Sequence, residues 1–211
     1  MKEDILEQTV DDWFLSQEST FTKHNIKFKP NSEDAEFIGN QDSVCSDIDV
    51  LAVHLEADGV NRVSAASCKS WQEGFYAKKA LEDLMNNKNK KWGGREIWKG
   101  FRELIIPKWG RAYSKKIFEE TLSKDFTYYL FVTKISGSKG EDLENSKKEF
   151  ENCKVFLDNL KYDSNAQVKI KIKTFKEIMV EHFLRKNSTT MEATEIGRLL
   201  QIFRASEIEL K

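Results

Sequence analysis

The stretch SVCSDIDVLAVHLEADGVNRVSAASCKSWQEGF (residues 43–75) constrains the fold of this chain more than any other segment. Residues 44–55 are rich in β-branched and other apolar side chains, as a strand requires. Ala57-Asp58-Gly59 follows as a tight-turn signal, and residues 61–69 return as a second apolar run. The pattern predicts an antiparallel β-hairpin.

The hairpin carries three charged side chains that its core does not need. Asp47 and Asp49 interrupt the first strand and, two residues apart, are expected to share one face. Lys69 ends the second strand after four small residues, 64–67, which leave room for a ligand. In a suitable register Asp49 and Lys69 converge. An acid that holds Mg²⁺ beside a lysine that orients or deprotonates water suits phosphodiester hydrolysis. An ordinary acid and lysine on a solvated sheet face are the alternative.

The rest of the chain reads as alternating helices and strands. The expected elements, in order, are a helix at 3–16, a short strand at 36–39, a helix at 75–87, a buried strand at 125–136, a helix at 142–160 and a half-exposed strand at 168–173. Capping-box patterns at Thr174/Glu177 and Thr189/Glu192 open two further helices. This order predicts an α/β fold with a mixed sheet and C-terminal helical additions.

At DIDVLAV and SCKSWQ the chain resembles the PD-(D/E)XK nuclease superfamily, the restriction-endonuclease-like fold. The resemblance implies an αβββαβ core with a mixed central sheet flanked by helices, over about residues 1–136. It implies that Asp49 is the first acid and principal metal ligand, that Asp47 is a supporting carboxylate and that Lys69 is the catalytic lysine. The family's second acid falls at position 67, where this chain has Ser67.

The resemblance also suggests where a replacement acid lies. A subset of related restriction enzymes has serine at this position and recruits an acid from the following helix. Glu73, Glu82 and Asp83 are the candidates here, and Asp83 is preferred because it shares a helical face with Tyr76 and Lys79. Alternatively the second acid is simply lost.

Two further residues gain possible roles from the resemblance. Gln72 follows the lysine by three positions and could bind a phosphate or the attacking water, or else cap the next helix. Glu7 lies on the first helix, which contributes a metal ligand in several branches of the superfamily. It is equally explained as the polar side of an amphipathic helix.

Residues 86–116 carry a strong local positive charge, with ten Lys or Arg against two Glu, although the whole chain has a net charge of −1. Basic residues interleaved with aromatics suit a phosphate backbone and stackable bases. The candidate nucleic-acid contacts are Lys88, Lys90, Lys91, Arg95, Lys99, Arg102, Lys108 and Arg111. The alternative is a solvated lysine-rich face whose aromatics (Trp92, Trp98, Phe101, Trp109 and Tyr113) anchor the core.

Length and composition favour one globular domain over residues 1–211, with a core at about 1–136, a basic insert at 86–116 and an extension at 137–211. No apolar run approaches the length of a membrane span, and the acidic, amphipathic N-terminus does not read as a secretory signal. Three widely spaced cysteines suggest reduced thiols. We therefore expect a cytoplasmic protein without a membrane partner.

These observations predict a Mg²⁺- or Mn²⁺-dependent nuclease that acts on DNA in restriction, defence or repair, as a homodimer or higher oligomer or with a partner protein that selects the target. A degenerate nuclease fold that only binds DNA or supports assembly is one alternative. A nucleotidyltransferase is another, because Gly39-Asn40 followed by Asp47 and Asp49 looks like that family's signature. Asn in place of serine, the short spacing and the lack of a role for Lys69 count against it.

Overall fold

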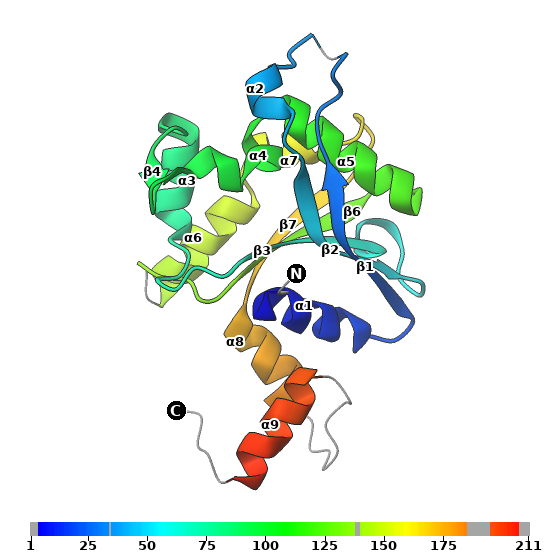
Figure 1. The fold of residues 1–211 in the computed structure, drawn as a ribbon, viewed down its shortest axis with the longest axis vertical. Helices are drawn as coiled ribbons and strands as arrows, with labels where there is room; N and C mark the ends of the chain where they lie inside the picture. The colour runs from blue at the N-terminus through cyan, green and yellow to red at the C-terminus, as the bar shows by residue number, and fades with distance from the viewer. Residues whose placement is uncertain (1–3, 34, 138–139, 185–194, 207–211) are drawn as a thin grey trace.

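The computed structural model describes residues 4–33, 35–137, 140–184 and 195–206. A mixed five-stranded sheet in the order β1-β2-β3-β6-β7 forms its centre, and helices flank both faces (Figure 1). The strands are β1 (Thr20–Phe28), β2 (Ser46–His54), β3 (Val63–Lys69), β6 (Phe126–Val132) and β7 (Val168–Thr174). The α/β class with a mixed, helix-flanked sheet is confirmed.

The predicted hairpin is confirmed as β2 and β3, which pair antiparallel across a short turn of 3₁₀ helix, η1 (Gly59–Asn61). β1 pairs antiparallel with β2, whereas β6 lies parallel to β3 and β7 lies parallel to β6. β6 is buried along nearly its whole length because it lies inside the sheet, with helices on both faces. Its continuous apolar run is typical of such a strand.

One face of the sheet is covered by α1 (Ile5–Leu15) together with α8 (Phe175–Ile178). Leu6, Val10 and Phe14, spaced four residues apart, form the buried stripe of α1. They pack against Val50, Ala52, Ala66 and Phe131 of the sheet. Asp4 caps the helix by accepting a 2.8 Å hydrogen bond from the Leu6 main-chain N–H.

The opposite face is covered by the helices between β3 and β7. These are α3 (Ala77–Asn86), α4 (Arg102–Ile105), α5 (Pro107–Thr121), α6 (Glu141–Glu151) and α7 (Lys154–Leu160). A small ribbon of β4 (Lys91–Trp92) and β5 (Arg95–Glu96) and the 3₁₀ helix η2 (Ile97–Gly100) complete the basic segment. The basic segment and the extension after residue 136 both contribute to the main hydrophobic cluster, so they share one core with the hairpin.

Near the N-terminus one predicted strand is absent and one strand of the structure was not predicted. Residues 36–39 form no strand; instead α2 (Gly39–Asp42), a single helical turn, precedes β2. The first strand is β1, which the sequence did not signal because it lies at the sheet edge and much of its length is exposed. Asn25 has a positive φ of 52° in the middle of β1, which further interrupts regular alternation.

The helix expected over 142–160 is two helices, α6 and α7, separated at Asn152 and Cys153. The capping box of Thr174 and Glu177 is confirmed at the start of α8, which continues as a π-helix over Met179–Leu184. α9 (Glu195–Ala205) is the last helix described. The predicted capping box at Thr189 and Glu192 lies outside the described residues. Within the described ranges, no helix is both long and apolar enough to cross a bilayer.

Candidate active site

The candidate site lies in a fork between β2 and β3. Their paired residues run from Val53 opposite Val63 to Val50 opposite Ala66, and pairing stops there. Beyond this point the Asp49 carboxylate accepts a 2.5 Å hydrogen bond from the Cys68 main-chain N–H. This side-chain hydrogen bond thus replaces the next main-chain pairing between β2 and β3, and the two strands separate around the Asp49 carboxylate.

Asp49 is buried within this fork, with 8% of its surface exposed. Burial raises its pKa to about 6, and the negative charges of Asp47 and Glu103 act in the same direction. The Lys69 ammonium and the Cys68 N–H oppose this rise. The Lys69 charge therefore lies near enough to Asp49 to lower its pKa, although the described structure contains no direct ion pair between the two side chains.

Glu7 of α1 is the second acid that the structure brings to this region. Burial raises its pKa to about 7, and the charges of Asp49, Asp4 and Asp47 add to the rise, whereas Lys69 lowers it. The N-terminus of α1 is fastened to the end of β3, because the Ser70 hydroxyl donates a 2.6 Å hydrogen bond to Asp4. Docking of α1 on the sheet therefore places Glu7 beside the fork.

Cys68 lies between Ser67 and Lys69 on β3, and its thiol is not activated as a nucleophile in this setting. Burial raises the pKa of its thiol well above the usual range, and the Asp49 and Glu7 charges reinforce that rise. A thiol is a poor nucleophile compared with its thiolate. The residue serves the site through its main-chain N–H.

Asp47 and Gln72 lie at the open side of the fork. Asp47 forms a 2.6 Å ion pair with Lys27 on the neighbouring strand β1, so a lysine already neutralises it. Gln72 is exposed and, like Asp47, lines the cleft described below. Both can therefore meet a ligand in the cleft, but neither is buried with Asp49.

Ser67 belongs to a buried polar chain behind Asp49. Its side chain hydrogen-bonds to the Tyr128 hydroxyl, which donates a 2.7 Å hydrogen bond to Glu103 of α4. Glu103 is buried, and its charge raises the pKa of Asp49. The hydroxyl of Tyr113, also fully buried nearby, has no hydrogen-bond partner in the described structure. Glu103 is one of only two acids in the basic segment, which is the one sequence signal that could have identified it.

Asp83, the preferred replacement acid, has a different environment from the one expected. Its two carboxylate oxygens accept hydrogen bonds of 2.8 Å from Lys90 and 3.0 Å from the Trp92 indole. Burial opposes ionisation, but these bonds hold the pKa of Asp83 below its usual value. The structure therefore corrects the assignment: Asp83 ties the β4–β5 ribbon to α3. Glu73 and Glu82 are exposed, and of these Glu73 lines the cleft.

Lys108, predicted to contact nucleic acid, is instead buried and fully engaged. Its ammonium forms a 2.7 Å ion pair with Asp42 and donates a 2.7 Å hydrogen bond to the Glu36 carbonyl. The Trp109 indole donates to the same carboxylate at 2.9 Å. This group fixes α5 to α2, so the prediction for Lys108 was wrong.

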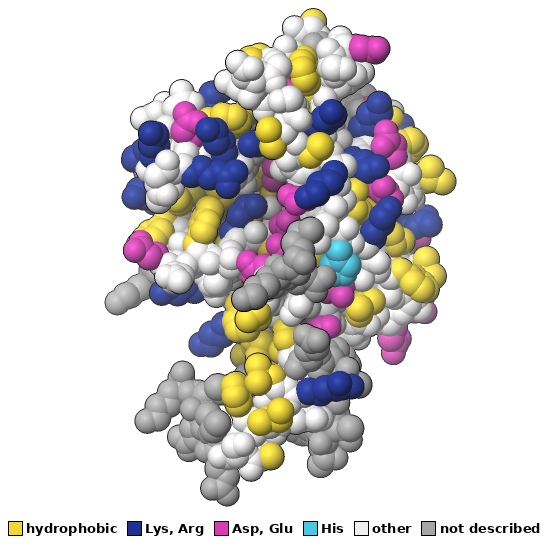
Figure 2. Space-filling view, in the orientation of Figure 1, with side chains coloured by type: hydrophobic (Ala, Val, Ile, Leu, Met, Phe, Trp, Pro, Cys, Tyr) yellow, Lys and Arg dark blue, Asp and Glu magenta, His cyan; other side chains and the backbone are white. Residues whose placement is uncertain are grey.

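The other basic residues predicted to contact nucleic acid differ in whether an acid already pairs with them. Lys90, Lys99 and Arg111 form ion pairs with Asp83, Glu96 and Glu36, respectively. Lys88, Lys91 and Arg95 have exposed side chains, whereas Arg102 is buried. The basic side chains gather over the insert, at the upper left of the view in Figure 2.

The aromatics of the basic segment serve the core. Trp98, Phe101, Trp109 and Tyr113 are all buried, and Trp92 is partly buried against the same cluster. The four buried rings therefore offer no open platform for stacking bases. For these rings the structure supports the alternative interpretation, in which they anchor the insert while its lysines and arginines face outward.

A cleft of about 850 Å³, here called the hairpin cleft, joins the fork to the insert. Asp47, Lys69 and Gln72 line it on the hairpin side. Lys91, Arg95 and Lys99 line it on the insert side. Acids and a lysine at one wall and a row of cations at the other suit an extended polyanion lying between them.

Within the described ranges, no three His, Cys, Asp or Glu side chains lie close enough together to form a complete metal site. Comparisons with protein-family models, with curated proteins and with solved structures found no match to this chain. Functional inference therefore depends on the geometry of the fork and the cleft.

Proposed function

We propose that this protein is a divalent-metal-dependent nuclease that hydrolyses phosphodiester bonds in DNA. The observation that carries the proposal is that Lys69 lies near enough to Asp49 and Glu7 to lower the pKa of each, and also lines a cleft with Lys91, Arg95 and Lys99 on its insert side. The proposal also assigns the chain to the restriction-endonuclease-like fold. The order α1, β1, β2, β3, α3, β6 and the antiparallel-then-parallel pairing around β3 support that assignment.

The carboxylates fit a hard cation. Burial raises the pKa of both Asp49 and Glu7, and the charges of neighbouring acids add to each rise, including that of Asp49 on Glu7. A divalent cation would relieve that repulsion. Mg²⁺ commonly binds through one or two carboxylates and completes its shell with water and substrate phosphate. Two acids are therefore enough, and a third protein ligand is not required.

When bound, Mg²⁺ would supply positive charge to the scissile phosphate and lower the pKa of the attacking water. The chain's own residues provide orientation and charge. Cys68 N–H holds the Asp49 carboxylate in one orientation. The Lys69 ammonium, at the mouth of the fork, would stabilise the negative charge that develops on the phosphate or orient the water. Gln72 in the same cleft would position the substrate.

Cleavage of supercoiled plasmid in the presence of Mg²⁺ or Mn²⁺ tests the proposal. Asp49→Asn and Lys69→Ala should each abolish nicking, and Lys169→Ala, at an exposed lysine of β7, provides the matched control. A protein that binds DNA but never cleaves it with either metal would instead be a degenerate binding module. A nucleotidyltransferase would retain most nucleotide-transfer activity in Lys69→Ala.

Metal binding is tested separately by the thermal unfolding midpoint with added Ca²⁺, which normally supports binding without hydrolysis. Wild-type protein should be stabilised, whereas Glu7→Gln should lose most of the stabilisation. Glu149→Gln is the matched control because Glu149 is an exposed glutamate on α6. Equal stabilisation of the two variants would remove Glu7 from the proposed site.

A further inference from the structure

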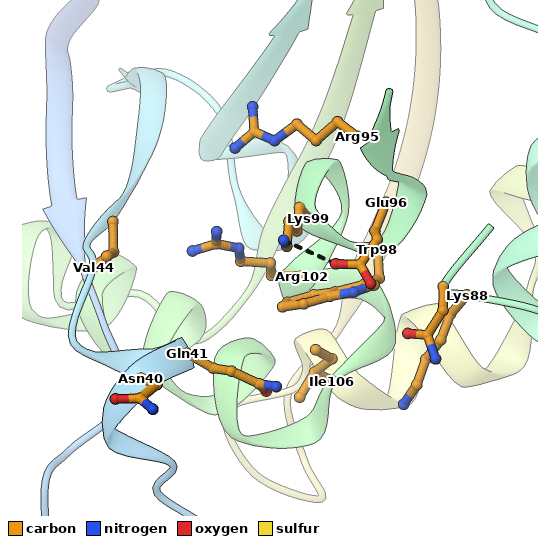
Figure 3. Close-up of a pocket in the computed structure, with 11 residues that line it drawn as sticks. Asn40, Gln41, Val44, Lys88, Arg95, Glu96, Trp98, Lys99, Arg102 and Ile106 are labelled. Carbon is orange, nitrogen blue, oxygen red and sulfur yellow. Dashed lines mark ion pairs between the residues drawn. The ribbon is translucent and has the colours of Figure 1, made fainter. Parts of the chain in front are cut away.

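A second concavity, here called the insert pocket, lies beside the hairpin cleft and has a volume of about 740 Å³. Its cationic lining consists of Lys88, Arg95, Lys99 and Arg102. Figure 3 shows the guanidinium groups of Arg95 and Arg102 pointing the same way, toward the segment that carries Gln41 and Val44. The pocket is thus a basic hollow between the insert and α2.

Arg102 is the unusual member of this set because its charge is buried. Only 9% of its surface is exposed, and its Nε atom has no hydrogen-bond partner in the described structure. The rings of Trp98 and Trp109 lie 5.6 and 4.8 Å from its guanidinium carbon. No carboxylate in the described ranges forms an ion pair with it. Burying such a charge without an anion is costly.

The charges around Arg102 are mixed. Burial lowers the pKa of Arg102, the positive charge of Arg95 lowers it further, and the negative charges of Glu103 and Asp42 raise it. Neither of these two acids lines the insert pocket. Glu96 is the one acid that lines the insert pocket, and its carboxylate is already paired with Lys99 at 2.8 Å. Two arginines and Lys88 therefore face the pocket without a lining carboxylate to balance them.

The geometry points to a bound phosphate group. We propose that the insert pocket binds a phosphate of a nucleic-acid strand, the neighbouring part of which occupies the hairpin cleft. Arginine presents a planar fork that matches the oxygens of phosphate. Arg95 and Lys99 line both the pocket and the cleft, so one strand can pass from one to the other. The choice of a nucleic acid rests on the proposed function, whereas the phosphate chemistry does not.

Anisotropy of a labelled single-stranded DNA oligonucleotide, measured in EDTA so that no cleavage occurs, tests this proposal. Arg95→Gln and Arg102→Lys should each weaken binding roughly tenfold, because the first loses a charge-assisted contact and the second loses the planar fork that matches phosphate oxygens. Arg95→Gln should also reduce the slope of log affinity against log salt by about 0.7, the value for one single-strand phosphate contact, whereas Arg102→Lys keeps its charge and should leave the slope nearly unchanged. Arg62→Gln, which removes an exposed arginine at the end of η1, should have little effect.

Arg95 is exposed, so its replacement tests the pocket even if Arg102→Lys fails to fold. Unchanged affinity and salt slope in Arg95→Gln would overturn the proposal. Competition by AMP and by inorganic phosphate tests whether the pocket instead binds the phosphate of a small molecule. Displacement of the oligonucleotide only at high concentrations of either would support the nucleic-acid strand. Tight binding of AMP or phosphate that the oligonucleotide does not displace would overturn it.

Plasmid cleavage separates this inference from the proposed function. If the wild-type protein never cleaves but its DNA affinity depends on Arg95 and Arg102, the phosphate pocket is supported and the proposed nuclease function is contradicted. If the protein cleaves DNA, and binds it equally well with and without the Arg95 side chain, the nuclease function is supported and the phosphate pocket is contradicted.

Discussion

The main-chain N–H of Cys68 donates a 2.5 Å hydrogen bond to the carboxylate of Asp49. This contact ends the β2–β3 ladder at Val50 and Ala66 and holds an acid inside the resulting fork. It offsets only part of the cost of burying the charge, because the pKa of Asp49 is still raised to about 6. The fold therefore keeps a buried acid at a cost in stability.

Asp49→Asn should consequently stabilise the protein while abolishing the proposed cleavage. A raised acid pKa means that the folded state binds more protons than the unfolded state, so stability falls as pH rises from about 4 to about 6. The variant should be more stable than wild type at pH 8 by on the order of 2–3 kcal/mol, and the difference should vanish toward pH 4. Urea unfolding at several pH values measures this. Destabilisation at pH 8 would contradict the explanation.

The proposed cleavage should require both acids in their ionised forms. With pKa values of about 6 for Asp49 and about 7 for Glu7, the rate should rise with pH through this interval at low metal concentration. A cation that binds the ionised acids should shift the rise to lower pH as its concentration increases. Initial rates measured at two Mg²⁺ concentrations provide the comparison. A profile independent of metal concentration would separate these acids from the metal.

Glu103→Gln should lower the pKa of Asp49, because the Glu103 charge contributes to its rise. Glutamine can still accept the Tyr128 hydrogen bond, so the buried chain remains satisfied. We expect the acidic limb of the pH–rate profile to move to lower pH, with the plateau rate largely retained. Glu149→Gln, at an exposed position of α6, should leave the profile unchanged. A Glu103 variant with an unshifted profile would contradict this coupling.

Lys108→Met should destabilise the fold by about 3–5 kcal/mol, because it leaves Asp42 buried without its cation. Burial opposes ionisation of Asp42, yet the bonds from Lys108, the Ile38 main chain and Trp109 hold its pKa below the ordinary value. The double variant Asp42→Asn/Lys108→Met should recover part of the loss. Denaturant unfolding measures both, and a double variant less stable than Lys108→Met would contradict the pairing.

Gly110→Ala should also destabilise the protein, by roughly 1–3 kcal/mol. A Cβ at this position of α5 would lie 2.2 Å from the Asn159 carbonyl oxygen of α7, so the helices would have to separate. Gly100→Ala is the matched control, since a Cβ there meets nothing within 4 Å. Equal thermal midpoints for the two variants would show that the close approach is not needed.

The sequence was most informative where periodicity and turn chemistry agree. Two apolar runs joined by Asp58-Gly59 specify the β2–β3 hairpin, and the apolar run of β6 specifies a buried strand. β1 escaped prediction because an edge strand needs few apolar side chains. The break between α6 and α7 also escaped, because apolar residues continue at helical spacing across it.

The sequence by itself determined the hairpin and put an acid, a serine and a lysine at its open end, because strand periodicity is a local property. Only the tertiary structure decided which other acids reach them. Docking of α1 places Glu7 there, and packing of α4 beneath the sheet places Glu103 behind Ser67. Asp83 had the expected spacing but faces Lys90 and Trp92. Such distances depend on how whole helices pack on a sheet, which residue spacing along one element does not encode.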